Sequence, residues 1–97
     1  AGGYRISDPA ADLAVAGALI SALAEKPIPA DAVLFGEVAL SGEIRPVAHA
    51  PMRLREAAKL GFERALVPAS VADGAKGITL SGYRTLAQFV DHMLGRG

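Results

Sequence analysis

The sequence predicts a mixed α/β fold, in which helices pack on a sheet with parallel and antiparallel strands. Three observations support this class. Helical and β-rich segments alternate along the 97 residues, a hairpin pattern interrupts the alternation, and hydrophobic residues make up 52% of the chain against 21% charged residues. This composition is that of a folded globular protein, and the length suits one small core.

The first helix is expected over residues 9–24. Proline suits the first helical position, and Asp8 before it can cap the free N–H groups. No charged residue occurs between Asp12 and Glu25, and a helix that is apolar on every side is expected inside a domain. About twelve apolar residues are too few to cross a bilayer, which takes ~20. The segment is therefore predicted to be a buried core helix, preceded by a short strand at residues 4–6.

A β-hairpin is expected next, with strands over residues 33–40 and 43–47 joined by a two-residue turn at Ser41 and Gly42. Gly36 inside the first strand predicts a bulge or a close approach of another backbone. The hairpin supplies the antiparallel part of the sheet.

The second helix is expected over residues 52–60, with Gly61 as its left-handed cap. Leu54 begins its inward stripe, while Arg55 and Lys59 lie four residues apart on its outer face. This helix is therefore amphipathic, unlike the first.

Two strands and a helix complete the predicted fold. The strands are expected over residues 62–68 and 77–81. Thr85 and Gln88 form a capping box for the last helix, whose apolar residues recur at helical spacing. The predicted order is strand, helix, two strands, helix, two strands, helix, with no internal repeat.

Charge, cysteine and histidine content restrict the function classes. The ten basic and ten acidic residues cancel, so a nucleic-acid or membrane role would need a local basic patch. The lack of cysteine excludes a disulfide framework and a thiolate metal site, and His49 and His92 are too far apart to form a metal motif. No secretory signal pattern is present, so the cytoplasm is expected.

Four segments of the chain carry a family resemblance. They are the proline-led alanine-rich helix, the hairpin motif from Gly36 to Gly42, Arg45-Pro46-Val47, and the helix end from Ala57 to Phe62. Together they resemble the proteolytic domain of Lon-type proteases, a fold related to the second domain of ribosomal protein S5. Within that superfamily, the chain is most similar to the C-terminal Lon-like domain of the RadA (Sms) family of bacterial DNA-repair proteins.

The resemblance implies an active site that has lost its catalytic residues. Lon-type enzymes use a serine activated by a lysine, but Ala10 stands at the serine position and Pro51 stands at or next to the lysine position. Nucleophilic catalysis needs an attacking oxygen and a base within hydrogen-bonding reach. We therefore expect no catalytic residue and no enzyme activity in this domain, with a Ser-Lys-type peptidase of the Lon family, active or residual, as the alternative.

The resemblance also implies a larger assembly. Residues 1–97 are expected to form a single Lon-like domain, a C-terminal fragment of a longer ATPase that processes branched recombination intermediates. The domain would support assembly of a hexameric ring and DNA binding without sequence specificity. ATP, magnesium and zinc are expected only in the missing N-terminal part, with no cofactor or metal in this fragment and no membrane partner.

Basic residues in several segments are the candidate DNA contacts. They are Arg5, Arg45, Arg53, Arg55 and Lys59. Clustered positive charge is the electrostatic footprint of phosphate binding. The competing interpretation is that each is a solvated surface charge, and for Arg55 and Lys59 the nearby Glu56 and Glu63 favour it.

Overall fold

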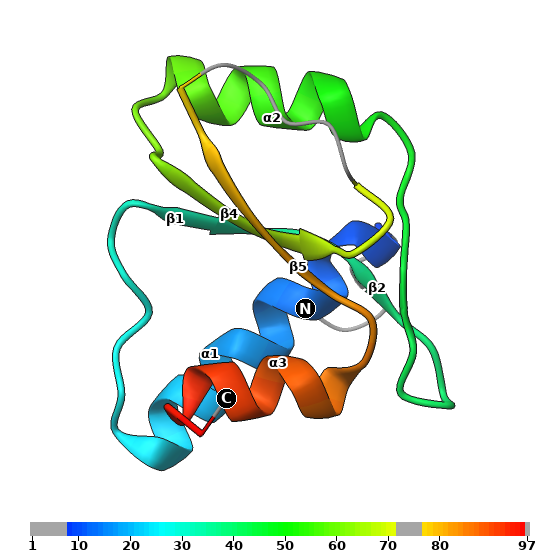
Figure 1. Cartoon of the computed structure of the whole chain (residues 1–97), viewed down its shortest axis with the longest axis vertical. Helices are drawn as coiled ribbons and strands as arrows, with labels where there is room; N and C mark the ends of the chain where they lie inside the picture. The colour runs from blue at the N-terminus through cyan, green and yellow to red at the C-terminus, as the bar shows by residue number, and fades with distance from the viewer. Residues whose placement is uncertain (1–7, 72–76, 97) are drawn as a thin grey trace, which may run out of the picture.

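The computed structural model describes residues 8–71 and 77–96. A three-stranded parallel sheet forms its centre, in the order β1 (Ala32–Leu34), β4 (Arg64–Pro68), β5 (Thr79–Tyr83). Helix α2 (Ala50–Lys59) covers one face of the sheet, and α1 (Asp12–Ala24) and α3 (Leu86–Met93) cover the other (Figure 1). A separate antiparallel pair, β2 (Glu37–Val38) and β3 (Ile44–Arg45), lies beside these layers. The predicted α/β class is confirmed, whereas the parallel and antiparallel strands form two separate sheets rather than the one mixed sheet that the sequence predicts.

Side-chain alternation along β4 divides the core into two clusters. Ala65 and Val67 face α2 and pack with Leu54, whereas Leu66 faces the other way and packs with the cluster that contains Leu13 and Phe89. Successive residues of a strand point to opposite faces of the sheet, so a strand buried on both faces must be apolar throughout. The central position of β4 thus follows from its uninterrupted hydrophobic run.

The predicted hairpin differs from the observed strands. The expected strand over residues 33–40 is broken at Phe35 and Gly36 into β1, which pairs in parallel with β4, and β2, which pairs with β3. The break arises because Gly36 leaves the sheet to bond the start of α1. Its N–H donates to the Ala10 carbonyl at 2.9 Å, and its carbonyl accepts the Leu13 N–H at 3.0 Å. The close backbone approach predicted for Gly36 is therefore confirmed, although a single continuous strand is wrong.

The turn of the hairpin is also longer than predicted. The Ala39 N–H donates to the Glu43 carbonyl at 2.9 Å, and three residues, Leu40 to Gly42, lie between them. Gly42 has a φ of 90°, which favours glycine. A three-residue loop with glycine at the left-handed position replaces the expected two-residue turn.

The burial predicted for α1 is wrong for its outer side. Leu13 and Gly17 are buried on the inner side, but Val15, Leu19 and Leu23 are 49%, 60% and 86% exposed. Only one side of a helix can meet a sheet edge and a neighbouring helix, so an all-apolar helix in a short chain must present apolar residues outward. No helix in the described part of the chain is long and apolar enough to cross a membrane.

The predicted helix ends are largely confirmed. α2 begins two residues early at Ala50, and Gly61 follows its end with a φ of 96°, as expected for a left-handed cap. The Thr85 hydroxyl accepts the Gln88 N–H at 3.2 Å at the start of α3. The second arm of the capping box differs, because Gln88 Oε1 accepts the N–H of Arg84 rather than that of Thr85.

Two predicted strands remain to be compared with the structure. The strand expected over residues 77–81 is observed two residues later as β5. The strand expected at residues 4–6, together with Arg5, lies outside the described residues.

Candidate functional site

The start of α1 is the first part of the candidate site, because it carries Ala10, the position that the resemblance led us to compare with a serine. A short 3-10 turn (Pro9–Ala11) precedes the helix, and Asp8 Oδ1 accepts the Ala10 N–H at 3.0 Å. Ala10 is 3% exposed and belongs to the cluster beneath α2. The predicted cap by Asp8 is confirmed, and the side chain of Ala10 is a buried methyl group of the core.

The first turn of α2 is the second part of the site. His49 precedes it in the left-handed region with a φ of 63°, and Pro51 is exposed in its first turn. Arg53 extends back from this turn, with Nε donating to the Ala48 carbonyl at 3.0 Å and Nη2 lying 3.5 Å from Asp8 Oδ2. The fold therefore brings the region of Ala10 and the region of Pro51 together through an ion pair between Asp8 and Arg53.

Asp12 closes the site on the side of β2. Its Oδ2 accepts the N–H of Val38 at 3.0 Å. A carboxylate that accepts a strand N–H near a helix N-terminus is stabilised by both the bond and the helix dipole. Asp12 therefore ties the start of α1 to β2, a role that its position in the sequence did not indicate.

Asp8, Asp12 and Arg53 form ion pairs and hydrogen bonds with backbone groups. A shallow cleft of about 390 Å³ runs beside them, and its polar side chains within the described residues are Asp8 and Arg53. Neither supplies an attacking hydroxyl or an amine base, which nucleophilic catalysis of the Ser-Lys type requires. The arrangement is that of a structural contact between two elements.

The basic residues predicted to bind DNA fall into separate groups. Arg55 and Lys59 are exposed on the outer side of α2, where Lys59 Nζ lies 3.9 Å from Glu56 Oε2. Among the described residues, Arg55 has no ion-pair partner. Arg53 differs, because its side chain turns back to Asp8. Glu56 thus lies near Lys59 as expected, at the long end of ion-pair distance, and among the described residues Arg55 has no such neighbour.

Arg45 belongs to a different surface. It lies on β3, where its Nε contacts Glu43 Oε1 at 2.9 Å, and it lines a cleft of about 580 Å³ with Ser70 and Arg84. Arg84 was not predicted. Its place beside Arg45 depends on a bond of 2.8 Å from the Ile44 N–H to the Arg84 carbonyl, a contact between distant segments that no local sequence pattern indicates.

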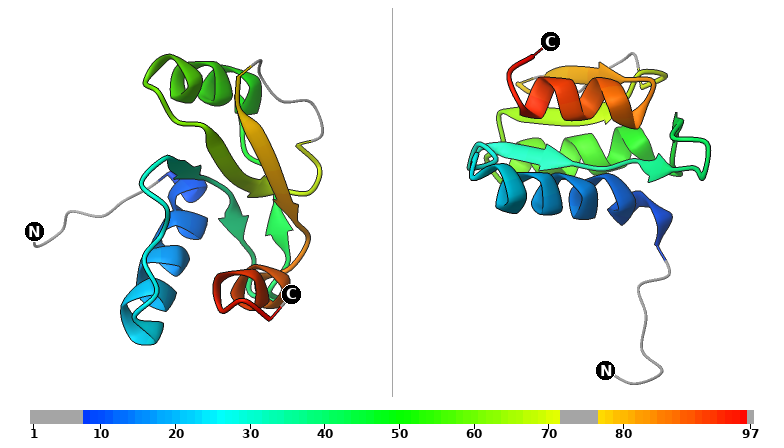
Figure 2. Two further views of the ribbon diagram at one scale, coloured as in Figure 1. Left: turned by 60° about the vertical axis from the view of Figure 1, so that its left-hand side comes forward. Right: turned by 90° about the horizontal axis from the view of Figure 1, so that it is seen from below.

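The outer side of α1 forms a third surface, which we call the α1 outer face. It consists of Val15, Ala18, Leu19, Ala22 and Leu23, all of them exposed. The face carries no charge, and an exposed apolar patch of this kind is typical of a surface that meets another protein. It lies on the opposite side of the sheet from α2, as the views in Figure 2 show.

The described residues offer no evident metal site. Within residues 8–71 and 77–96, no group of three or more His, Asp or Glu side chains is placed to hold a metal ion. The expectation that this fragment holds no metal or cofactor stays a prediction.

Comparisons with known proteins place the chain in a sequence family. Residues 3–71 match the family model ChlI, described as subunit ChlI of Mg-chelatase. The chain is 62% identical over 68 residues to the DNA repair protein RadA of Brucella abortus and 55% identical over 71 residues to that of Aquifex aeolicus. It is 52% identical over 69 residues to the protein of the same name from Escherichia coli.

These matches cover most of the chain and little of its relatives. They include 70%, 73% and 71% of this chain but only 15%, 16% and 15% of the three relatives, respectively. What the whole relatives do therefore involves much sequence that this chain does not contain.

Proposed function

The chain belongs to the family of subunit ChlI of Mg-chelatase, and we propose that it is a non-proteolytic scaffold domain of a DNA-repair ATPase. The name of the relatives, DNA repair protein RadA, supports the repair role. Family membership alone carries no activity, because one fold hosts many functions and the side chains of the site decide among them. The domain would act in the cytoplasm on branched recombination intermediates.

One observation carries the scaffold role: the two outward surfaces of the fold have opposite character. The α1 outer face is apolar and uncharged, whereas the outer side of α2 carries Arg55, Glu56 and Lys59 beside the exposed Met52. They lie on opposite sides of the sheet (Figure 1). Apolar surface favours burial against protein, whereas exposed arginine and lysine favour phosphate. We assign the α1 outer face to subunit contacts in a hexameric ring and the α2 surface to DNA.

The Lon-like character of the domain rests on the site at the start of α1. Ala10 and Pro51 stand where a serine and a lysine would be expected, and the pair Asp8–Arg53 joins their two segments. We propose that the fold keeps the geometry of a Lon proteolytic domain without its chemistry. A fluorogenic peptide assay tests this directly, since turnover by the longer protein would contradict it.

Phosphate contacts made by Arg55 and Lys59 would carry no base information. The binding would therefore be independent of sequence and sensitive to salt, because each neutralised phosphate releases counterions. The net charge of the chain is +0, so the 97 residues alone should bind DNA weakly, and the ATPase part must supply most of the affinity.

A pair of double variants in the longer, full-length protein tests the two assignments separately. Leu19→Asp with Leu23→Asp should abolish ring assembly in sedimentation velocity. Arg55→Glu with Lys59→Glu should leave the ring intact, lower DNA affinity at least tenfold and flatten its salt dependence. Each variant thus serves as a control for the other.

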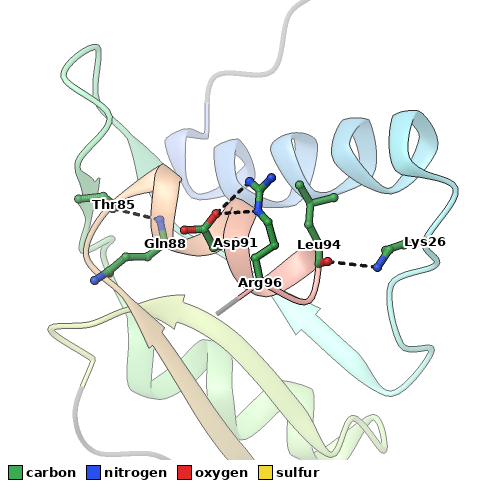
Figure 3. A network of polar contacts seen from close by, with 6 residues as sticks. All are labelled: Lys26, Thr85, Gln88, Asp91, Leu94 and Arg96. Atoms are coloured by element: carbon green, nitrogen blue, oxygen red, sulfur yellow. Dashed lines mark hydrogen bonds and ion pairs between the residues drawn. The ribbon is translucent and has the colours of Figure 1, made fainter.

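Lys26→Glu with Arg96→Glu makes the same net-charge change at the opposite end of the fold from α2 (Figure 1). These two side chains bond groups in and just after the last turn of α3 (Figure 3). This control should change DNA affinity much less than the α2 variant. If both charge reversals weaken DNA binding equally, α2 is not the DNA surface. If the α1 variant still forms rings, the α1 outer face is not the subunit contact.

A further inference from the structure

Two arginines from distant parts of the chain border one cleft. Arg45 lies on β3, and Arg84 directly follows β5. Together with Ser70 they line the cleft of about 580 Å³ beside β3. Both arginines are exposed. The fold therefore brings two strong N–H donor groups, each with a permanent positive charge, to one concave surface.

The cleft lies at the carboxyl ends of two parallel strands. β4 and β5 run in parallel, and they end at Pro68 and Tyr83. Ser70 and Arg84 come directly after these ends. In open α/β sheets, ligands bind in crevices outside the carboxyl ends of the strands. The position of the cleft thus points to a ligand independently of its charge.

The turn that carries Ser70 is held firmly against β5. The Ala69 N–H donates to the Tyr83 carbonyl at 2.8 Å. A Cβ atom on Gly82 would lie 3.0 Å from the Cα atom of Ala69, so the two backbones are in close contact. One wall of the cleft is therefore fixed by backbone packing.

The backbone of Arg84 is held on both sides. Its carbonyl accepts the Ile44 N–H of β3 at 2.8 Å, and its N–H donates to Gln88 Oε1 at 2.8 Å. The first of these bonds also sets the position of β3, and with it that of Arg45. A preformed site loses less entropy when a ligand binds.

The charges that line the cleft favour an anion. Its described charged residues are Arg45, Arg84 and Glu43, so positive charge exceeds negative charge. The ion pair with Glu43 engages Nε of Arg45 at 2.9 Å, and a guanidinium has further N–H donors on its two Nη atoms. This pair is exposed and contributes little to stability, so Glu43 does not exclude an anion. Among the described residues, Arg84 has no ion-pair partner.

A phosphate group suits these donors. Arginine binds phosphate and carboxylate through paired N–H donors. A phosphate group has enough oxygen atoms to accept bonds from both guanidinium groups and from the Ser70 hydroxyl, whereas a carboxylate has two. Three donors around one anion therefore favour phosphate.

We propose that the cleft between β3 and the carboxyl ends of β4 and β5 binds a phosphate group, carried by a nucleic-acid strand or by a free nucleotide. Arg45 and Arg84 neutralise its charge, and the Ser70 hydroxyl donates a further hydrogen bond. The site is separate from the surface proposed for DNA on α2, and it stands whether or not α2 binds DNA.

NMR titration of the 97-residue chain with two probes tests the proposal. The probes are a thymidine hexanucleotide without a terminal phosphate, and ATP. At least one probe should shift the amide signals of Ser70 and Arg84 and the Nε–H signal of Arg45 until they saturate. A stronger response to the hexanucleotide identifies a strand as the source of the phosphate, and a stronger response to ATP identifies a free nucleotide.

Two double variants give a matched comparison of charge. Arg45→Gln with Arg84→Gln should lower the affinity of the responding probe, measured at the cleft signals, at least tenfold. Arg55→Gln with Lys59→Gln removes the same charge from α2 and should change that affinity less than threefold. Equal losses in the two variants would mean that the net charge of the chain attracts the probe, and would overturn the proposal.

Glu43→Gln gives a change in the opposite direction. Its amide oxygen still accepts a bond from Arg45 Nε, but the negative charge is gone, so affinity should rise at least twofold. A loss of affinity would overturn the proposal. Amide spectra confirm the fold of each variant. The proposal is equally overturned if neither probe shifts the cleft signals, even where the amides of Arg55 and Lys59 shift and so support the α2 surface.

Discussion

Helices α1 and α2 pack on opposite faces of one sheet, but the side chains that they expose to solvent differ in character. α2 buries Leu54 and Ala57 and turns charged residues outward, as a surface helix does. α1 buries Leu13 and Gly17 and turns Leu19 and Leu23 outward. The inner contacts of the two helices are alike, but their outer surfaces are suited to different partners.

The difference shows that the exposed side chains of a helix can vary while its buried side chains still pack on the sheet. Stability of the fold depends on the buried residues of both helices, whereas association depends on residues that the isolated chain exposes. Leu19 and Leu23 on α1 should therefore behave unlike the buried Leu54 on α2, even though all three lie in helices on the same sheet.

The largest effect is expected at Leu54, which is 0% exposed. Leu54→Ala should lower the free energy of unfolding by ~3 kcal/mol, because it removes buried methyl groups and leaves a cavity. Leu19→Ala, at a position 60% exposed, should change it by less than ~0.5 kcal/mol in the monomeric chain. Urea unfolding followed by circular dichroism measures both. Equal losses would mean that α1 is buried in solution by self-association.

The next largest effect is expected at Gly17, where α1 comes closest to its neighbours. A Cβ atom there would lie 2.7 Å from Leu34 Cδ2 and 3.3 Å from Phe89 Cζ. Gly17→Val should therefore destabilise the fold by ~2 kcal/mol through overpacking.

Ala18→Val is the matched control for that variant, since Ala18 is exposed on the next position of the same helix. It should change the free energy of unfolding by less than ~0.5 kcal/mol. A stable Gly17→Val protein would show that α1 is able to shift away from the sheet and α3, and that its close approach is not required.

Much of the fold could be predicted because its signals are local. Asp8 and Pro9 at a helix start, Gly61 at a helix end and Thr85 before α3 act through neighbouring backbone groups, and the structure has each as expected. The apolar run of β4 likewise fixes its place at the centre of the sheet. Local signals determine where elements begin, end and become buried.

The misses come from contacts between distant segments. β1 and β2 look like one strand until Gly36 bonds Ala10 and Leu13. Gly36 indicates that a backbone comes close, but nothing within residues 33–40 identifies the start of α1 as that partner or shows that the strand breaks there. The exposure of Leu23 depends on how little of α1 a short chain can cover. At the candidate site, the sequence identified Arg53 as basic, but its pairing with Asp8 required the fold.

A smaller effect is expected at Asp12, the charged residue in the first turn of α1. Asp12→Ala should cost ~1 kcal/mol, because the partly buried N–H of Val38 loses its acceptor. Asp12→Asn keeps an oxygen acceptor and should cost less than half as much. Thermal unfolding of the two variants gives the difference. If both are equally destabilised, the charge near the helix N-terminus matters more than the bond to β2.

The smallest effect is expected at Tyr83, which holds α3 against β5 through Phe89 and His92. Burial raises the pKa of Tyr83 above its usual value of 10.0, and a hydrogen bond with Ser81 opposes part of the rise. The folded state therefore favours the protonated phenol, so the stability it contributes is complete below pH ~10 and is lost as the pH rises through the folded pKa. Urea unfolding between pH 8 and 11 should show a decline in stability at the alkaline end that Tyr83→Phe lacks, by less than ~1.4 kcal/mol for each unit that separates the two pKa values. An identical alkaline decline in both proteins would place its origin in other groups, and the contact of α3 with β5 would then be independent of the Tyr83 proton.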